Sequence, residues 1–174
     1  IDYKFPQGSV HEYLASFYGS TYEESKSISF RLLYGGIDKD IAKSIPFFGK
    51  VQHFIDERWG EFNRDNYVKT NIYSRRIHKD NIIDVNKNKL FNYIIQAHET
   101  ETNIKTIIEL NYYLLNRKTK LVLYGYDSFL FDVHKDDRVQ VFRELKNILE
   151  RNGHLVKAKA GKNYGEMVNI TEKI

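Results

Sequence analysis

The sequence lacks several features that define whole classes of protein. It contains no cysteine, which excludes disulfides, thiolate metal sites and a cysteine nucleophile. No apolar run approaches the roughly 18 residues of a transmembrane helix, and no signal-peptide pattern is present. The 174 residues begin with Ile1 rather than a methionine, so we expect a piece of a longer protein. What remains is a chain of 41% hydrophobic and 29% charged residues, which argues against disorder.

The charge balance and the aromatic content leave the class of partner open. Lys and Arg total 27 against 23 for Asp and Glu, which gives a net charge of +4. This excess permits a polyanionic partner without identifying one. The 13 tyrosines and 11 phenylalanines suit stacking on bases or sugars, although most of them should belong to the core.

Hydrophobic periodicity predicts helices first and most strands later. The predicted helices are 10–17, 23–34, 38–44, 46–62, 86–116 and 136–152. A β-like stretch over 67–78 turns near Ser74, and short strands are predicted over 120–124, 129–133 and 154–160. This order indicates an α+β fold in which a small antiparallel sheet is covered by helices. We expect two parts, a helical region with a β-like hairpin over 1–82 and the remainder over 83–174.

Sequence signals mark both ends of the helix predicted at 23–34. Ser20 and Thr21 precede Glu23 and Glu24 by three residues each, which is a capping-box pattern. Gly35-Gly36 follows the last periodic residue and is a strong stop signal. The helix therefore has defined ends, and its register can be used to place side chains on one face.

One face of this helix combines a cation with two aromatic rings. Lys26, Phe30 and Tyr34 are spaced i, i+4 and i+8, so they fall within an arc of roughly 80°. An ammonium suits a phosphate, and flat rings suit a base and a sugar. The alternative is an ordinary amphipathic helix with both rings in the core and Lys26 in solvent.

Asp127 lies in a predicted hairpin turn, Gly125-Tyr126-Asp127-Ser128, between two apolar strands. An exposed carboxylate there suits Mg²⁺, which prefers oxygen ligands and often keeps substrate phosphates in its shell. The alternative is an ordinary turn aspartate, because Asp is common in turns. No His, Asp and Glu spacing resembles a zinc site, and no Ser-His-Asp motif or phosphate-cradling glycine loop stands out.

Five further side chains suit contacts with a nucleic acid or an anion. Asn92 and Gln96 are four residues apart on the long helix, where their amides suit minor-groove acceptors. His11 near a helix start suits an anion, and Arg75-Arg76 suits phosphates. The alternative for each of them is a solvated surface residue, which is the more usual case for such side chains.

Taken in order, these segments resemble the C-terminal polymerase region of family A DNA polymerases, the DNA polymerase I and T7-like phage group. KSISFRLLYG at 26–35 resembles motif B, K-x-x-x-F-x-x-x-Y-G, and YGYDSFLFD at 124–132 resembles motif C, usually H-D-E or H-D-S before a hydrophobic strand. NYIIQ at 92–96 matches the N-x-x-x-Q of the preceding helix, and GKNY at 161–164 resembles a C-terminal G-x-N-W. His11 falls where the family has a histidine in a D-I-H-type segment.

The resemblance implies a fragment of a template-directed DNA polymerase that transfers dNMP to a primer 3′-OH with two Mg²⁺ ions. Lys26, helped by His11, would hold the triphosphate of the incoming nucleotide. Phe30 and Tyr34 would pack on its sugar and base. Asp127 would be one of the two metal-binding aspartates and, with Lys26, a catalytic residue.

The same resemblance implies DNA contacts and a wider assembly. Asn92 and Gln96 would contact the minor groove, Tyr126 and Ser128 would lie near the primer end, and the pair Arg75-Arg76 is expected to bind DNA. Residues 1–82 would be fingers-like and 83–174 a partial palm. The partners would be primer-template DNA, a dNTP and the rest of the polymerase chain with motif A and the thumb. No membrane is involved, and the location would be cytoplasmic, in the bacterial host if the chain is phage-encoded.

Some positions depart from the family pattern. At two positions where the family has an arginine, this sequence has Tyr22 and Asn88. Either triphosphate binding would be weaker without the first arginine, or another base such as Lys39 or Lys43 would compensate for it. Motif C has Tyr126 in place of histidine and Ser128 where many bacterial members have glutamate. This Tyr-Asp-Ser form and the compact connection over 46–70 are more phage-like than bacterial.

Motif A, D-Y-S-x-I-E-L-R, is missing from the sequence. Asp2-Tyr3 matches only its first two residues and lies too close to His11 to be its equivalent. With one catalytic aspartate instead of two, we do not expect this chain alone to polymerise. Three alternatives stay open: a single-subunit RNA polymerase, which typically has methionine at the position of Phe30, a non-catalytic nucleic-acid-binding module, and an α+β domain with no nucleic-acid role.

Overall fold

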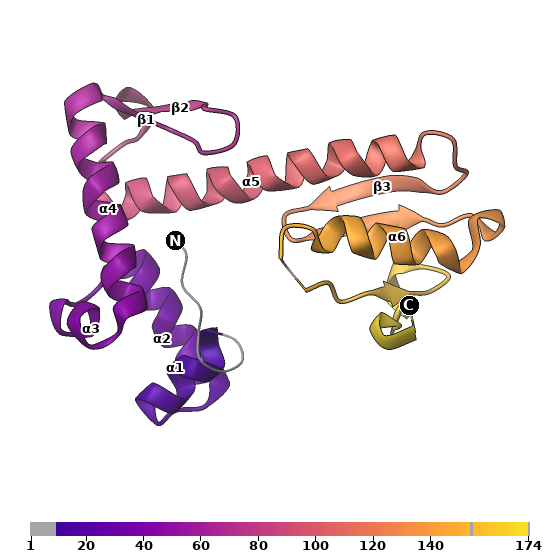
Figure 1. The fold of residues 1–174 in the computed structure, drawn as a ribbon, viewed down its shortest axis with the longest axis horizontal. Helices are drawn as coiled ribbons and strands as arrows, with labels where there is room; N and C mark the ends of the chain where they lie inside the picture. Colours follow the sequence, from indigo (N-terminus) through magenta and orange to yellow (C-terminus); the bar gives the residue numbers. More distant parts are fainter. Residues whose placement is uncertain (1–9, 154, 174) are drawn as a thin grey trace. The chain divides into compact units, whose positions relative to one another are not determined.

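The structure, a computed structural model, describes residues 10–153 and 155–173. The chain packs as two compact units, Ile1–His98 and Glu99–Ile174. Helices predominate, as Figure 1 shows. The described residues form three two-stranded antiparallel sheets. The predicted α+β class is therefore confirmed. No helix in the described part of the chain is both long and apolar enough to cross a membrane.

The first unit is mainly helical. Its elements are α1 (Val10–Tyr18), α2 (Tyr22–Gly35), α3 (Lys39–Ser44), α4 (Pro46–Asp65), β1 (Tyr67–Lys69), β2 (Arg76–His78), η1 (Lys79–Asn81) and the first part of α5 (Lys87–Leu114). All four early helices were predicted to within a few residues. The predicted β-like stretch is the β1–β2 hairpin, and Ser74 in its loop has a φ of 52°.

The predicted signals at the ends of α2 are confirmed. The Thr21 backbone N–H donates to Glu24 Oε2 at 2.9 Å, and the Glu24 N–H donates to Thr21 Oγ1 at 3.3 Å. This reciprocal pair satisfies two backbone donors that the first turn leaves free. At the other end, Gly36 has a φ of 116°, which stops the helix after Gly35.

The core of the first unit joins its helices and its hairpin. Most of the fully or almost fully buried apolar side chains come from α1, α2, α4 and α5, and they include Leu14, Leu32, Phe48, Val51, Ile55, Phe62, Leu90, Phe91 and Ile94. Val68 of β1 is also fully buried and packs in the same cluster as Phe62. Gly49 lets α3 approach α4 closely, because a Cβ at this position would lie 2.7 Å from the Ala42 carbonyl oxygen. Leu32 of α2 packs in one core cluster with Leu14 and Phe48, and this packing fixes where α2 is held.

The second unit places a hairpin against two helices. Its elements are the rest of α5, β3 (Lys120–Gly125), β4 (Ser128–Asp132), η2 (Lys135–Asp137), α6 (Arg138–Glu150), β5 (Lys159–Ala160), η3 (Tyr164–Glu166), β6 (Val168–Asn169) and η4 (Thr171–Lys173). Strands β3 and β4 pair antiparallel and are joined by the two residues between Gly125 and Ser128. Side chains from α5, α6 and the hairpin share one core, with Leu110, Val141 and Leu145 among its buried members.

The last predicted strand, 154–160, is wrong in its extent. In the described residues it shrinks to β5, and β5 pairs with β6 rather than with the hairpin. The reason is that side chains take up its backbone donors. The Val156 N–H donates to Glu150 Oε1 at 3.0 Å, and the Ala158 N–H donates to Thr171 Oγ1 at 2.9 Å. A strand cannot use the same donors for a ladder.

Candidate functional site

The predicted aromatic side chains of α2 are stacked and exposed. The rings of Phe30 and Tyr34 have centroids 5.9 Å apart and planes inclined by 15°. Their exposed fractions are 42% and 43%, so the alternative that places both rings in the core does not hold. Exposed aromatic rings offer flat surfaces on which a base or a sugar can stack.

His11 of α1 joins this surface from a second helix. Its ring centroid lies 5.9 Å from that of Phe30, and the Ser25 hydroxyl donates to the His11 carbonyl oxygen at 3.0 Å. Burial lowers the pKa of His11 below its usual 6.5, and the nearby Lys26 ammonium lowers this pKa further while Glu23 opposes the change. Lys26 and His11 are therefore close enough to interact electrostatically. We call His11, Tyr22, Lys26, Phe30 and Tyr34 the α2 face.

Tyr22 is a member of the α2 face that sequence reasoning missed. Its ring meets that of His11 edge-on at 5.6 Å, where the family resemblance expects an arginine. The signal was available, because Tyr22 precedes Lys26 by four residues and so extends the same helical stripe by one turn. Lys39 and Lys43, named as possible substitutes for that arginine, are exposed on α3. They do not belong to the α2 face as defined by ring and electrostatic contacts.

The first half of α5 brings a polar side chain to the end of α2. Asn88 Nδ2 donates to the Gly35 carbonyl oxygen at 2.9 Å. Asn88, which stands where the family has its second arginine, therefore links the start of α5 to the end of α2. Asn92 is half-buried, and its Oδ1 is buried without a hydrogen-bond partner among the described residues. Gln96 is exposed one turn further along the helix. Asn92 is therefore not simply a solvated side chain.

The two arginines of the β1–β2 hairpin differ in their surroundings. Both are exposed. The Arg76 guanidinium lies 4.7 Å from the centre of the Tyr67 ring, which is a cation–π contact. The Arg75 backbone N–H donates to Thr70 Oγ1 at 2.9 Å and anchors the turn.

In the second unit, Asp127 lies at the tip of the β3–β4 hairpin, as predicted. Tyr126 precedes it with a φ of 48° and is 86% exposed, and Asp127 is also exposed. The Ser128 hydroxyl donates to the Gly125 carbonyl oxygen at 2.9 Å across the turn. Asn103 of α5 donates to the Tyr126 carbonyl oxygen, a contact that sequence reasoning missed because no pattern in the chain pairs a helix residue with this turn.

The described residues supply one carboxylate, not a complete metal site. Among them, no group of three or more His, Cys, Asp or Glu side chains is placed to hold a metal ion. Asp127 alone cannot fill the shell of a divalent cation, so a metal ion at this tip would need further ligands from elsewhere. Asp2, the weak candidate for a second aspartate, lies outside the described residues.

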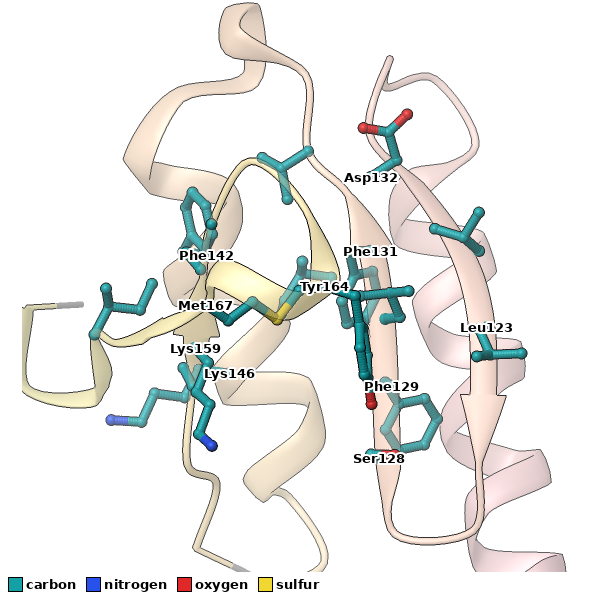
Figure 2. Close-up of a pocket in the computed structure, with 18 of the residues that line it drawn as sticks. Leu123, Ser128, Phe129, Phe131, Asp132, Phe142, Lys146, Lys159, Tyr164 and Met167 are labelled. Atoms are coloured by element: carbon teal, nitrogen blue, oxygen red, sulfur yellow. The ribbon is translucent and has the colours of Figure 1, made fainter.

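A cleft of about 1170 Å³ opens beside the hairpin within the second unit. Figure 2 shows β3 and β4 on one side of it and α6 with the C-terminal segment on the other. Its lining mixes apolar side chains with lysines, including Leu123, Phe131, Phe142, Met167, Lys146 and Lys159. Val122 and Leu123 of β3 keep exposed fractions of 60% and 58%. The hairpin thus leaves apolar surface uncovered by the described residues.

The Gly-Lys-Asn-Tyr motif at 161–164 has a local structural explanation. A Cβ at Gly161 would lie 2.6 Å from the Glu166 carbonyl oxygen, so only glycine fits without displacement of the backbone. Asn163 Oδ1 accepts from the Gly165 N–H at 3.0 Å, and Asn163 Nδ2 donates to Glu166 Oε2 at 2.8 Å. The motif therefore closes the turn that leads into β6, and Tyr164 is left exposed at the cleft.

Comparisons with known proteins identify the fold. No family model and no curated protein sequence match this chain. Among solved structures, it is similar to the POL domain of Pol1 from M. smegmatis, in complex with DNA primer-template and dNTP, with a TM-score of 0.64 and 16% sequence identity. The match covers 85% of this chain and 32% of that chain. The chain thus has a polymerase-like fold and spans about a third of the chain it matches.

Proposed function

We propose that this chain is part of a template-directed DNA polymerase and contributes its nucleotide-binding surface and one metal-binding carboxylate. The observation that carries the proposal is the α2 face, on which exposed stacked rings adjoin a cation within a polymerase-like fold. The similar POL domain was solved with DNA primer-template and dNTP, which supports the same kinds of partner here. The family A assignment comes from the motif resemblance.

Each residue of the α2 face has a role that its chemistry supports. The Lys26 ammonium would bind the triphosphate, since it is a compact charge with three donors. The neutral form of His11, favoured by its lowered pKa, would donate a hydrogen bond to the same anion without competing for a proton. Phe30 and Tyr34 would stack on the base and the sugar, while Tyr22 holds the His11 ring in place. Such positioning is most of what phosphoryl transfer asks of a protein.

Asp127 would occupy one position in a Mg²⁺ site completed by another part of the polymerase. When bound, Mg²⁺ would neutralise charge on the phosphates of the reactants. The exposed hairpin tip supports this role because it leaves the carboxylate accessible. Tyr126 and Ser128 flank it and would lie near the primer end, with Asn92, Gln96 and the Arg75-Arg76 pair as DNA contacts.

The rest of the polymerase would have to supply what this chain lacks. Residues 1–82 would act as the fingers-like part and 83–174 as a partial palm. The cleft beside β3 and β4, with its uncovered Val122 and Leu123, supports packing of a further polymerase segment there. Burial of such surface is favourable by about 25 cal/mol per Å². The isolated chain is therefore expected to bind primer-template DNA but not to extend it.

The test uses the chain joined to the upstream segment of its parent polymerase. Asp127→Ala should abolish primer extension and leave primer-template binding largely intact, because a single exposed carboxylate contributes little to a polyanion contact. Asp132→Ala is the matched control, an exposed carboxylate at the far end of β4. Extension by Asp127→Ala within a few-fold of wild type would exclude the metal role. A parallel assay with rNTPs tests DNA synthesis, since a preference for rNTPs would favour an RNA polymerase.

A further inference from the structure

One side-chain amide holds the hairpin tip in two places. Asn103 of α5 uses Nδ2 to donate to the Tyr126 carbonyl oxygen and to the Tyr124 hydroxyl oxygen, both at 2.9 Å. An amide group has two N–H donors, so both bonds can form at once. All three residues belong to the second unit. The amide thus connects a packed helix to the peptide group that precedes Asp127.

This turn needs such a connection because its backbone is in an unfavourable region. Tyr126 has a φ of 48°, which residues with a Cβ adopt rarely outside turns. Its own side chain is 86% exposed, so packing of the ring does little to hold the backbone. The carbonyl oxygens of Gly125 and Tyr126 both accept from side chains, the first from Ser128 and the second from Asn103. The Asn103 bond ties the tip to α5, another element of the second unit.

We propose that Asn103 is a positioning residue for Asp127. By fixing the peptide group between Tyr126 and Asp127, its amide sets the direction in which the Asp127 carboxylate leaves the hairpin. Asn103 itself contacts neither substrate nor metal. The inference rests on the proposed function for its catalytic consequence, but the geometry it asserts is a property of the chain alone.

The first experiment tests the geometry in the 174-residue chain. Asn103→Asp keeps the size of the side chain and removes both donors while its carboxylate is ionised. Amide hydrogen exchange, followed by NMR, should become about tenfold faster at Gly125 and Ser128, the residues paired across the turn, as expected for loss of hydrogen bonds of ordinary strength. Asn111→Asp, an exposed position on the same helix, adds the same charge and should leave these rates unchanged. Unchanged exchange in Asn103→Asp would overturn the proposal.

Two further measurements separate positioning from general support of the fold. Tyr124→Phe removes one acceptor and leaves the bond to Tyr126, so it should change exchange at Ser128 by less than Asn103→Asp does. In Asn103→Asp, lowering the pH protonates the introduced carboxyl group, which then has an O–H donor again. The Asp127 amide resonance should therefore return toward its wild-type position as the pH falls. An equal loosening of core amides such as those of Leu110 and Leu145, without this recovery, would show a merely structural role.

The second experiment tests the consequence for catalysis in the chain joined to its upstream segment. Asn103→Asp should lower kcat for extension about tenfold with little change in KM for dNTP or in primer-template affinity, because only the carboxylate is misdirected. Asn111→Asp should keep wild-type kinetics. Unaltered kcat in Asn103→Asp would overturn the positioning role. Absence of extension by the wild-type protein would instead count against the proposed function, and the exchange measurements would stand on their own.

Discussion

The His11 ring on α1 and the Phe30 ring on α2 lie 5.9 Å apart, so the α2 face is built from two helices. A buried hydrogen bond joins the same two helices, because Ser25 is fully buried and its hydroxyl donates to the His11 carbonyl oxygen. Leu14 and Leu32 pack in one core cluster and complete the contact. The buried contacts between α1 and α2 therefore set the positions of the exposed side chains of the α2 face.

The pKa of His11 should report its distance from Lys26. In the wild-type chain we expect a pKa below 6.5, because burial and the Lys26 ammonium both disfavour the imidazolium ion. Lys26→Met removes one of these two causes and should raise the pKa of His11. Glu23→Gln should lower it further, since the Glu23 carboxylate favours the charged ring. NMR titration of the His11 ring protons measures both changes.

Lys39→Met provides the control for this titration. Lys39 is exposed on α3 and does not influence the pKa of His11, so its removal should leave the titration curve in place. A His11 pKa that is the same in Lys26→Met and in the wild type would show that the two groups are not neighbours. It would also remove the geometric basis for a shared anion site.

Phe30→Ala should weaken nucleotide binding far more than it weakens the fold. Stacking of a base on an aromatic ring contributes about 1–3 kcal/mol, so KM for dNTP should rise about tenfold or more in the polymerase that contains this chain. Phe17→Ala is the control, an exposed aromatic of α1 outside the α2 face, with a similar exposed fraction of 48%. Equal effects of the two substitutions on KM would contradict a stacking role for Phe30.

Local signals explain how much of the fold the sequence predicted. Thr21 with Glu24 and Gly35-Gly36 define α2 within its own residues, and the hairpin turn at 125–128 is equally local. The prediction of a strand over 154–160 was wrong because backbone N–H groups there donate to the side chains of Glu150 and Thr171. No sequence pattern predicts such side-chain hydrogen bonds. Prediction succeeded where the determining contacts lie within a few residues.

In the candidate site, too, local patterns were predicted and contacts between distant elements were not. Helical spacing alone placed Lys26, Phe30 and Tyr34 on one face, and the structure confirms that arrangement. Asn103 could not be predicted, because its role depends on the packing of α5 against a hairpin more than twenty residues further along the chain. Spacing along one element predicts a surface, whereas contacts between elements require the fold.

Gly161→Ala should destabilise the second unit through a backbone collision. The added Cβ would lie 2.6 Å from the Glu166 carbonyl oxygen and 2.9 Å from its carbon, and a backbone group cannot move aside as a flexible side chain can. Overpacking of this kind costs about 1–3 kcal/mol of unfolding free energy. Gly165→Ala is the matched control, because its Cβ would meet Asn163 Oδ1 at an ordinary 3.5 Å. Thermal unfolding measures both, and equal melting temperatures would refute the tight approach.

The contact between Thr119 and Asp137 should make the second unit sensitive to acid. Thr119 is fully buried, and its hydroxyl and backbone N–H donate to Asp137 Oδ2 at 2.6 and 2.7 Å. Both bonds lower the pKa of Asp137 below the ordinary 3.8, and the bond from the Thr119 hydroxyl has the larger effect. Because the folded state holds the carboxylate ionised, its stabilising effect is complete well above pH 3.8 and is lost as the pH falls through the lowered pKa.

Asp137→Asn should therefore unfold at a lower urea concentration near neutral pH and lose less stability on acidification than the wild type. Asparagine keeps one oxygen acceptor but loses the charge that strengthens both bonds. Urea midpoints measured between about pH 3 and pH 7 give the two curves to compare. Asp132→Asn removes an exposed carboxylate that accepts no hydrogen bond from the described residues. Its urea midpoint should therefore change with pH in parallel with that of the wild type. If Asp137→Asn also ran parallel, the Thr119 contact would not be the source of the acid sensitivity.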